Sequence, residues 1–412
     1  MRSPTPLGMT VGRPVIRIME VFPTLGQPYG WAEGVAEGLS NGLARLGHKV
    51  EIVTTGGHLA QAGRHGAVTL RCFPVDAWTR RGPRLVRTAY VSTTLARYLR
   101  WSAPGFDLIH VHTLYSFVAA SAARAARRAH VPYVMSPCGS LDPYTHVRKG
   151  RFRKDVFQAL YHRRDLARAA AVHFLSEGEL EVARPFTIAA PKVVVKLGLS
   201  ADKYSLEPSG LFTRWHPELA GSRVIMYLGR ISYTKGLDLL VRAFARIAQR
   251  FEDAHLVLAG PDYEGFGRVL AEMLPSRGLT NRVTFSGLLS EADKIAALAD
   301  ADVLVLPSYT EAFGMVLLEG MASGLPVVVT DRAALAPVVR DAGTGLVVPS
   351  DDQSLAEALS SLLADAGLRR VMGRRGRRLV ETRFSWTQSA RAFARLYEAA
   401  TDVPVLERRA AS

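Results

Sequence analysis

The chain has 412 residues, of which 48% are hydrophobic and 22% are charged, so it is too long for one ordinary core and fits a globular protein of two similar domains rather than a disordered or fibrous one. Its two cysteines, Cys72 and Cys138, form no CxxC or Cys/His spacing, which argues against a disulfide framework or a zinc site and favours a reducing cytoplasm. The formal net charge of +15 comes almost entirely from residues 1–210, which contain 28 Lys and Arg against 14 Asp and Glu, because the remainder contains 24 against 23.

Neither the N-terminus nor the first half predicts a segment that crosses a membrane. Residues 1–14 lack the apolar core of a signal peptide, so we expect no export signal. The longest stretch of the first half without Lys, Arg, Asp or Glu, Leu108 to Ala123, is shorter than a membrane span and contains two histidines. We therefore expect a cytoplasmic protein without a transmembrane helix.

Short runs rich in β-branched residues alternate with helical patterns along the chain, which is typical of parallel sheets flanked by helices. In the first half, the strands are predicted at Val15–Phe22, Val50–Thr54, Val68–Phe73, Leu108–His112, Tyr133–Ser136, Ala171–Leu175 and Val193–Lys196. A second series follows at Val224–Leu228, Leu256–Ala259, Val283–Ser286, Val303–Pro307, Val327–Thr330 and Gly345–Val348.

A segment rich in turn-forming residues separates the two series. Pro208, Gly210, Pro217 and Gly221 interrupt any regular pattern, so we predict a linker at residues 206–222. The fold class is therefore α/β, with two doubly wound, Rossmann-like domains at residues 1–205 and 223–385. Ligands of such sheets bind at the carboxyl ends of the strands, so we expect the active site in the cleft between the domains.

Between Arg80 and Arg168 there are 17 basic and 4 acidic residues. This asymmetry favours attraction of the first domain to anionic lipid headgroups or to a phosphorylated acceptor. A solvated, arginine-rich face explains the same pattern equally well. A third reading, a nucleic-acid-binding protein, predicts salt-sensitive binding through this segment and is the weaker alternative.

The segment from Leu306 to Val328 predicts a strand, a turn, a helix and another strand. Gly314 permits a tight turn into the helix, whose first amides, from Phe313 to Val316, have no intrahelical partner and suit an anion such as a diphosphate. Glu311 precedes the helix and Glu319 lies one to two turns inside it, so both carboxylates can face one pocket and accept hydrogen bonds from sugar hydroxyls. Isolated glutamates are usually solvated, but the surrounding pattern favours a site.

A second basic element follows the strand that ends near Leu228. Arg230 and Lys235 lie in a short loop before a helix that begins near Gly236. Both side chains can reach a pyrophosphate above the cleft, where positive charge stabilises a departing nucleotide diphosphate. We therefore predict that both are catalytic together with Glu311, although lone basic loop residues are commonly solvated.

The Glu-x7-Glu pattern of Glu311 and Glu319 resembles that of the GT-B glycosyltransferases of family 4, the group 1 type, which includes bacterial mannosyl- and glucosyltransferases. The resemblance implies that Glu319 holds the nucleotide ribose and Glu311 contacts the donor sugar. It implies further that the helix-start residues, Phe313, Gly314, Met315 and Val316, meet the sugar and phosphates. A terminal helix at about residues 386–400 is expected to pack back onto the first domain, as in the family.

The first domain is expected by the same resemblance to bind the acceptor. The turn after its first strand resembles the family's glycine loop, so Gly26 is a donor-binding candidate and Tyr29 an acceptor-side one; a plain strand-to-helix turn is equally consistent. His112 ends a strand near the expected cleft and is a second acceptor-side candidate. Cys138, the third, stands where many relatives carry histidine.

The resemblance also implies the chemistry. Relatives retain the anomeric configuration, by front-face attack in which the acceptor hydroxyl passes its proton to the departing phosphate oxygen, so we expect no protein base. No Asp-x-Asp motif lies in a suitable loop, so we expect no essential metal and no cofactor beyond the UDP- or GDP-sugar. An epimerase or phosphorylase of the same fold is the alternative within this class. A Rossmann oxidoreductase is disfavoured, because no G-x-G-x-x-G string occurs.

Overall fold

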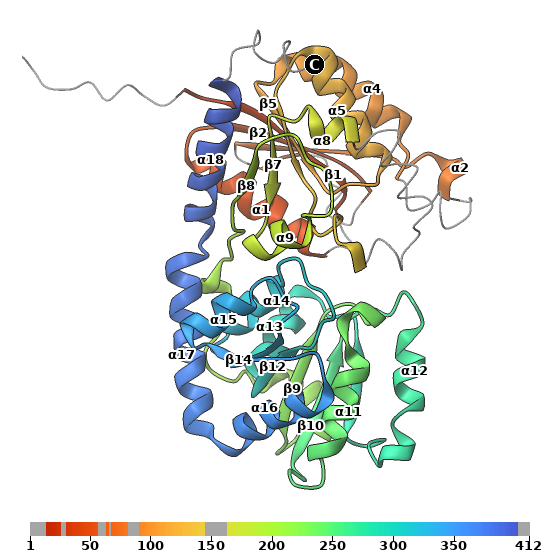
Figure 1. Cartoon of the computed structure of the whole chain (residues 1–412), viewed down its shortest axis with the longest axis vertical. Helices are drawn as coiled ribbons and strands as arrows, with labels where there is room; N and C mark the ends of the chain where they lie inside the picture. Colours follow the sequence, from red (N-terminus) through yellow and green to blue (C-terminus); the bar gives the residue numbers. More distant parts are fainter. Residues whose placement is uncertain are drawn as a thin grey trace, which may run out of the picture.

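The structure is a computed structural model that describes residues 14–25, 30–56, 63–65, 67–80, 90–144 and 163–402. Two α/β units lie one above the other along the long axis of the molecule (Figure 1). Each unit is built on its own sheet, with helices on both faces. The predicted pair of doubly wound α/β units is therefore confirmed.

The first unit contains an eight-stranded sheet in the order β3-β4-β2-β1-β5-β6-β7-β8. All of its strand pairs are parallel except β3 with β4, and the short β3 was not predicted. Because the chain moves outward from β1 to β2 and then returns to β5, the topological switch point lies between β1 and β5. The strands are β1 (Arg17–Thr24), β2 (Lys49–Thr55), β3 (Gly63–His65), β4 (Val68–Phe73), β5 (Leu108–His112), β6 (Tyr133–Ser136), β7 (Ala171–Phe174) and β8 (Lys192–Val194).

Serine caps begin three of the helices in this unit. The side chains of Ser92, Ser116 and Ser176 each accept a hydrogen bond from the amide three residues later, which satisfies one of the free donors of a helix start. The described helices are α1 (Gly30–Arg45), α2 (Ala77–Arg80), α4 (Thr93–Ser102), α5 (Phe117–Ala129), α8 (Arg163–Ala167) and α9 (Glu177–Val182).

The second unit contains a six-stranded, wholly parallel sheet in the order β11-β10-β9-β12-β13-β14, so its switch point lies between β9 and β12. Its strands are β9 (Arg223–Leu228), β10 (Ala254–Ala259), β11 (Val283–Gly287), β12 (Val303–Leu306), β13 (Val327–Thr330) and β14 (Gly345–Val348). Its helices are α10 (Leu211–Trp215), α11 (Leu237–Ile247), α12 (Phe266–Glu272), α13 (Glu291–Ala299), α14 (Met315–Ala322), α15 (Ala336–Ala342) and α16 (Asp352–Ala364).

Two long helices connect the units. α17 (Ala366–Arg383) packs on the second unit, and α18 (Trp386–Asp402) returns to lie along the first (Figure 1). α18 meets α1 at small residues: a Cβ atom added to Gly38 would lie 2.0 Å from the Trp386 ring, and one added to Gly42 would lie 2.7 Å from the Ala390 methyl group. Only glycine therefore permits this close approach.

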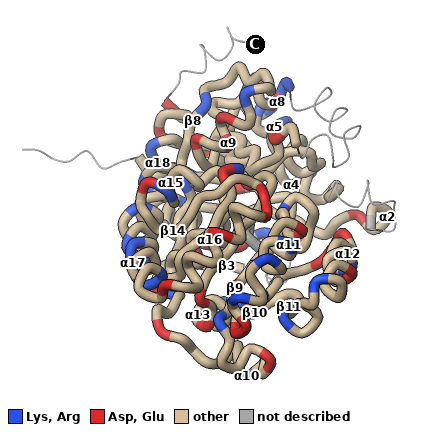
Figure 2. Tube along the Cα trace, turned by 60° about the horizontal axis from the view of Figure 1, so that its bottom comes forward, with Lys and Arg blue, Asp and Glu red and all other residues tan. Residues whose placement is uncertain are grey.

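The near-neutral charge of the second half is unevenly distributed. Lys and Arg positions follow one another along α17, as Figure 2 shows. Arg377 of this helix donates hydrogen bonds to the backbone oxygens of Tyr204 and Ala322, so part of this charge secures the helix to the second unit and to the segment before the linker. Within the described residues, no helix is long and apolar enough to cross a lipid bilayer.

Candidate active site

A cavity of about 1710 Å³ lies between the two units. Loops that follow β9, β10, β12 and β13 line it on one side, and loops that follow β6 and β7 line it on the other. These are the carboxyl ends of parallel strands, where doubly wound sheets bind ligands. The cavity therefore occupies the place where the strand pattern predicts a site.

The loop between β12 and α14 forms one wall of this cavity. Gly314 is the N-cap of α14 and has φ +85°, a conformation that favours glycine, and no side chain caps the helix start. Met315 and Val316 line the cavity, so the uncapped amides of this helix start lie where an anion would bind. The Phe313 side chain is buried, only 3% exposed, which leaves mainly its backbone for a ligand.

Glu311 and Lys235, two predicted site residues, form an ion pair at the cavity wall. Lys235 ends the short helical turn Tyr233–Lys235, and each of the two side chains is about one-sixth exposed, at 15% and 16%. The backbone oxygen of Glu311 accepts a hydrogen bond from the Ala334 amide at 2.9 Å, which anchors Glu311 to the loop after β13. Both side chains are accessible and the backbone of Glu311 is fixed, so a ligand can replace either partner of this ion pair.

Arg230, the third predicted catalytic residue, is exposed and also lines the cavity. Its loop is held because the Tyr227 hydroxyl donates a hydrogen bond to the Arg230 backbone oxygen at 2.7 Å. Gly229 before it has φ +149°, and a Cβ atom on Gly260 of the neighbouring loop would lie 2.0 Å from the Gly229 oxygen. The two loops can approach this closely only because residue 260 is glycine.

Glu319 lies in the same cavity as Glu311 but has different partners. Lys294 of α13 donates to a Glu319 carboxylate oxygen at 2.8 Å and pairs with Glu291 at 2.8 Å. Burial lowers the pKa of Lys294, but the two carboxylates outweigh it and hold the pKa above its ordinary value. The sequence reasoning missed Lys294, because one lysine in a helical pattern carries no distinguishing signal.

Cys138 lines the cavity from the first unit, in the turn after β6. Its φ is +49° and that of Gly139 is +78°, so the turn is strained at a residue with a side chain. Burial raises the pKa of the Cys138 thiol, and the neighbouring Glu179 carboxylate raises it further. The thiol therefore stays protonated at neutral pH.

Glu179 is a cavity-lining carboxyl group that the sequence reasoning did not single out. It is 5% exposed and accepts hydrogen bonds from the Gly139 amide at 2.5 Å and from the Leu175 amide at 2.7 Å. Burial raises its pKa to about 7, although the two amides act in the opposite direction. The pattern Ser176-x-x-Glu179 was the available signal, because a glutamate three residues after a serine cap is typical of a helix start.

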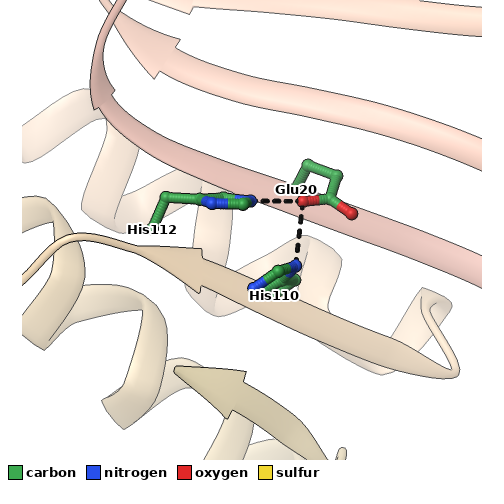
Figure 3. A group of neighbouring side chains, drawn as sticks. All are labelled: Glu20, His110 and His112. Atoms are coloured by element: carbon green, nitrogen blue, oxygen red, sulfur yellow. Dashed lines mark hydrogen bonds and ion pairs between the residues drawn. The ribbon is translucent and has the colours of Figure 1, made fainter. Parts of the chain in front are cut away.

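His112 lies beneath the surface and is not among the described residues that line the cavity. Its Nε2 atom lies 2.5 Å from a Glu20 carboxylate oxygen, and its ring stacks on Phe22 with centroids 4.0 Å apart. Figure 3 shows Glu20 of β1 between His110 and His112 of β5. His112 was predicted to lie in the cleft, but the structure places it in the buried part of the sheet. Its role on the acceptor side stays a prediction.

The cluster of Glu20, His110 and His112 is the only group within the described residues whose ligand atoms are close enough to hold a metal ion. Its atoms already have hydrogen-bond partners. The Tyr397 hydroxyl of α18 lies 2.8 Å from the other Glu20 oxygen and 2.6 Å from His110 Nδ1, and the remaining His110 nitrogen lies 2.6 Å from Ser136 Oγ. The arrangement therefore fits a buried hydrogen-bond network better than a metal centre.

The remaining predicted candidates, Gly26 and Tyr29, lie outside the described residues. The same is true of much of the basic segment, because residues 81–89 and 145–162 are not described.

Two family models match the chain. The model described as "Glycosyl transferase 4-like domain" matches residues 32–197, and the one described as "Glycosyl transferases group 1" matches residues 213–379. The chain is 26% identical over 381 residues to an uncharacterised glycosyltransferase of Methanocaldococcus jannaschii, covering 89% of this chain and 94% of the relative. It is 29% identical to a phosphatidyl-myo-inositol mannosyltransferase of Mycobacterium leprae, covering 76% and 79%.

Among solved structures, the fold is similar to that of Anabaena HepE in complex with UDP and glucose. The TM-score is 0.74 at 19% identity, over 93% of this chain and 99% of that chain. The two units and their arrangement are therefore those of the GT-B architecture.

Proposed function

Because the chain belongs to the group 1 glycosyltransferases, we propose that it moves a sugar from a UDP- or GDP-sugar to an acceptor hydroxyl with retention of the anomeric configuration. The observation that carries the proposal is the Glu311–Lys235 ion pair beside the uncapped start of α14. At this wall of the cavity, Glu311 can accept hydrogen bonds from sugar hydroxyls, Lys235 supplies a cation for phosphate, and the start of α14 supplies free amides.

The donor is proposed to lie along the second unit. Its diphosphate binds at the amides of Gly314, Met315 and Val316, with Arg230 and Lys235 on its other side. Its sugar contacts Glu311, and its ribose contacts Glu319, which Lys294 holds in place. The UDP and glucose in the Anabaena structure support this class of donor.

For the transfer step we propose the front-face course that the resemblance to the group 1 glycosyltransferases implies. The acceptor oxygen attacks the anomeric carbon on the face from which the diphosphate leaves, and the bond between that carbon and the diphosphate oxygen breaks. The electron pair goes to the phosphate oxygen, which takes the proton of the acceptor hydroxyl. Arg230, Lys235 and the helix-start amides stabilise the charge that develops, so the protein contributes position and electrostatics rather than a base.

The first test is a panel of UDP- and GDP-sugars in a thermal-shift assay, followed by release of free nucleotide diphosphate with and without candidate acceptor sugars and polyols. We expect stabilisation by one donor class and nucleotide release that depends on the acceptor. Stabilisation by no donor would contradict the proposal, and interconversion of the nucleotide-sugar without release would indicate an epimerase. Activity that persists in excess EDTA is expected, because the proposed step uses no metal ion.

We also propose peripheral contact of the first unit with an anionic membrane. α4 carries Arg97 and Arg100 together with Trp101, whose side chain is 75% exposed, and tryptophan is favoured at membrane interfaces. Co-sedimentation with vesicles that contain anionic lipid, compared with neutral vesicles, tests this contact. A variant with Trp101→Ala and Arg100→Glu is expected to bind the anionic vesicles more weakly.

A further inference from the structure

The two units touch directly beside Glu311. The Thr310 hydroxyl donates to an Asp142 carboxylate oxygen at 2.8 Å, and the Ser176 hydroxyl donates to the Ala312 backbone oxygen at 3.1 Å. Thr310 and Ala312 flank Glu311 in sequence, whereas Asp142 and Ser176 belong to the first unit. The position of the Glu311 loop therefore depends on contacts with the opposite domain.

Two glycines of the first unit make the approach close. A Cβ atom on Gly139 would lie 2.9 Å from the Ala312 methyl carbon, and one on Gly178 would lie 2.9 Å from Ala334 Cα. Ala334 is the residue whose amide binds the Glu311 backbone oxygen. The first unit is therefore in close contact with both chain segments that hold Glu311, the one at Ala312 and the one at Ala334.

Glu179 joins these two contact points within the first unit. One of its oxygens holds the Gly139 amide, in the strained turn that faces Ala312, and the other holds the Leu175 amide, next to Ser176. Its own amide donates to the Ser176 hydroxyl at 3.0 Å, which caps α9. Because its two oxygens accept hydrogen bonds from backbone amides of two different loops, Glu179 fixes both loops at once.

We propose that Glu179 is a positioning residue for sugar transfer: it holds the Cys138–Gly139 turn and the start of α9 as one rigid surface, against which the Glu311 loop is held when the two domains close. The inference rests on the proposed function, because it assumes that Glu311 contacts the donor sugar. Glu179 acts through the loop and does not itself contact the reacting atoms.

The test is Glu179→Gln, which keeps the size of the side chain but replaces one accepting oxygen with an NH₂ group. Leaving a buried backbone amide without its acceptor corresponds to roughly a tenfold effect, so we expect kcat to fall about tenfold. The affinity for the free nucleotide diphosphate, measured by calorimetry, is expected to change far less than kcat, because the proposed ribose and diphosphate contacts lie on α14, whereas Glu179 acts on the preceding segment around Thr310 and Ala312. Glu177→Gln is the matched control: Glu177 lies two residues earlier on the same helix, is exposed and does not line the cavity.

Wild-type kcat in a folded Glu179→Gln enzyme would overturn the inference, as would an equal loss in Glu177→Gln. A parallel loss of nucleotide affinity would assign Glu179 to donor binding and would also overturn it. The proposed function fails separately: Glu311→Ala with wild-type turnover contradicts the donor-sugar role, whereas a defect in Glu311→Ala alone contradicts only the role of Glu179.

Thr310→Val tests the same junction from the other domain and covers the case in which Glu179→Gln folds poorly; where both variants fold, they complete a double-mutant cycle. Thr310→Val removes the hydroxyl that binds Asp142 but keeps the shape of the side chain, and it lies in the other domain. Because both changes act on the same junction, their effects on kcat are expected to be less than additive. Fully additive effects, or wild-type kcat in Thr310→Val, would contradict the inference.

Discussion

The ionisable groups of the two units have different neighbours. In the second unit, Lys235, Glu311, Lys294 and Glu319 form ion pairs at the cavity wall, where a ligand can displace one partner. In the first unit, Glu20 and its histidines are fully buried and bind one another and Tyr397. From this difference we expect the accessible pairs to take part in the chemistry and the buried network to stabilise the fold. Substitutions in the second unit should change catalysis, and those in the network should change stability.

The largest effect is expected for Lys235→Ala. Removing a cation that stabilises the departing diphosphate should lower kcat by about 10²- to 10³-fold, a loss comparable to that of one oxyanion-hole donor. The measurement is steady-state nucleotide release with the identified donor and acceptor. Lys192→Ala, on an exposed residue of β8, is the control and should keep wild-type turnover. A wild-type kcat in Lys235→Ala would contradict the expectation that substitutions at the ion pairs of the second unit change catalysis.

Glu319→Ala is expected to act on binding rather than on turnover. The change removes the proposed acceptor of hydrogen bonds from the ribose hydroxyls and leaves Lys294 paired with Glu291 alone, so nucleotide affinity should fall by about 10- to 100-fold. Calorimetric titration with UDP and GDP measures it, with the exposed Glu252→Ala as control. Unchanged affinity would remove Glu319 from the donor site.

Tyr397→Phe tests the buried network. The change leaves a Glu20 oxygen and His110 Nδ1 without the hydroxyl that lies 2.8 and 2.6 Å from them, which should lower the free energy of unfolding by about 1–3 kcal/mol. Urea denaturation measures this loss. Turnover at a temperature where the variant is folded should be unchanged, and a selective loss of kcat would show that the network takes part in catalysis.

The most gradual effect is expected from pH. Burial lowers the pKa of His112 to about 4 and that of His173 to about 3, from the ordinary 6.5. Between these values and 6.5 the unfolded chain binds more protons, so the free energy of unfolding should fall as the pH drops from about 7 towards 4. His173→Asn should flatten this slope in denaturation curves measured across that range. A slope identical to that of the wild type would contradict the assignment.

The strands were predictable because each is a short apolar run. β4, β5, β6, β13 and β14 have the predicted bounds, and the other predicted strands differ at their ends by at most two residues. β3 was missed because Gly63–His65 has no apolar residue and pairs only through the hairpin with β4. The local sequence pattern therefore predicts the buried strands, but it does not predict a short polar strand at the edge of the sheet.

The site was predictable in its residue types but not in its contacts. The Glu311–Lys235 pair joins loops 76 residues apart, and Lys294 reaches Glu319 over 25 residues, because β9 and β12 are neighbours and α13 packs beside α14. The burial of His112 depends on Phe22 and on Glu20, which lie some 90 residues earlier. Spacing along the chain carries no information on such distant partners.

The return of α18 to the first unit has a consequence for biosynthesis. The ribosome completes the first unit early, yet Glu20 and His110 obtain their Tyr397 partner only 377 and 287 residues later. A nascent chain that ends before Trp386 has a carboxylate in its first core without this hydrogen bond, and its α1 glycines have no helix to pack against. The first unit can therefore complete its buried hydrogen-bond network only after α18 has been synthesised.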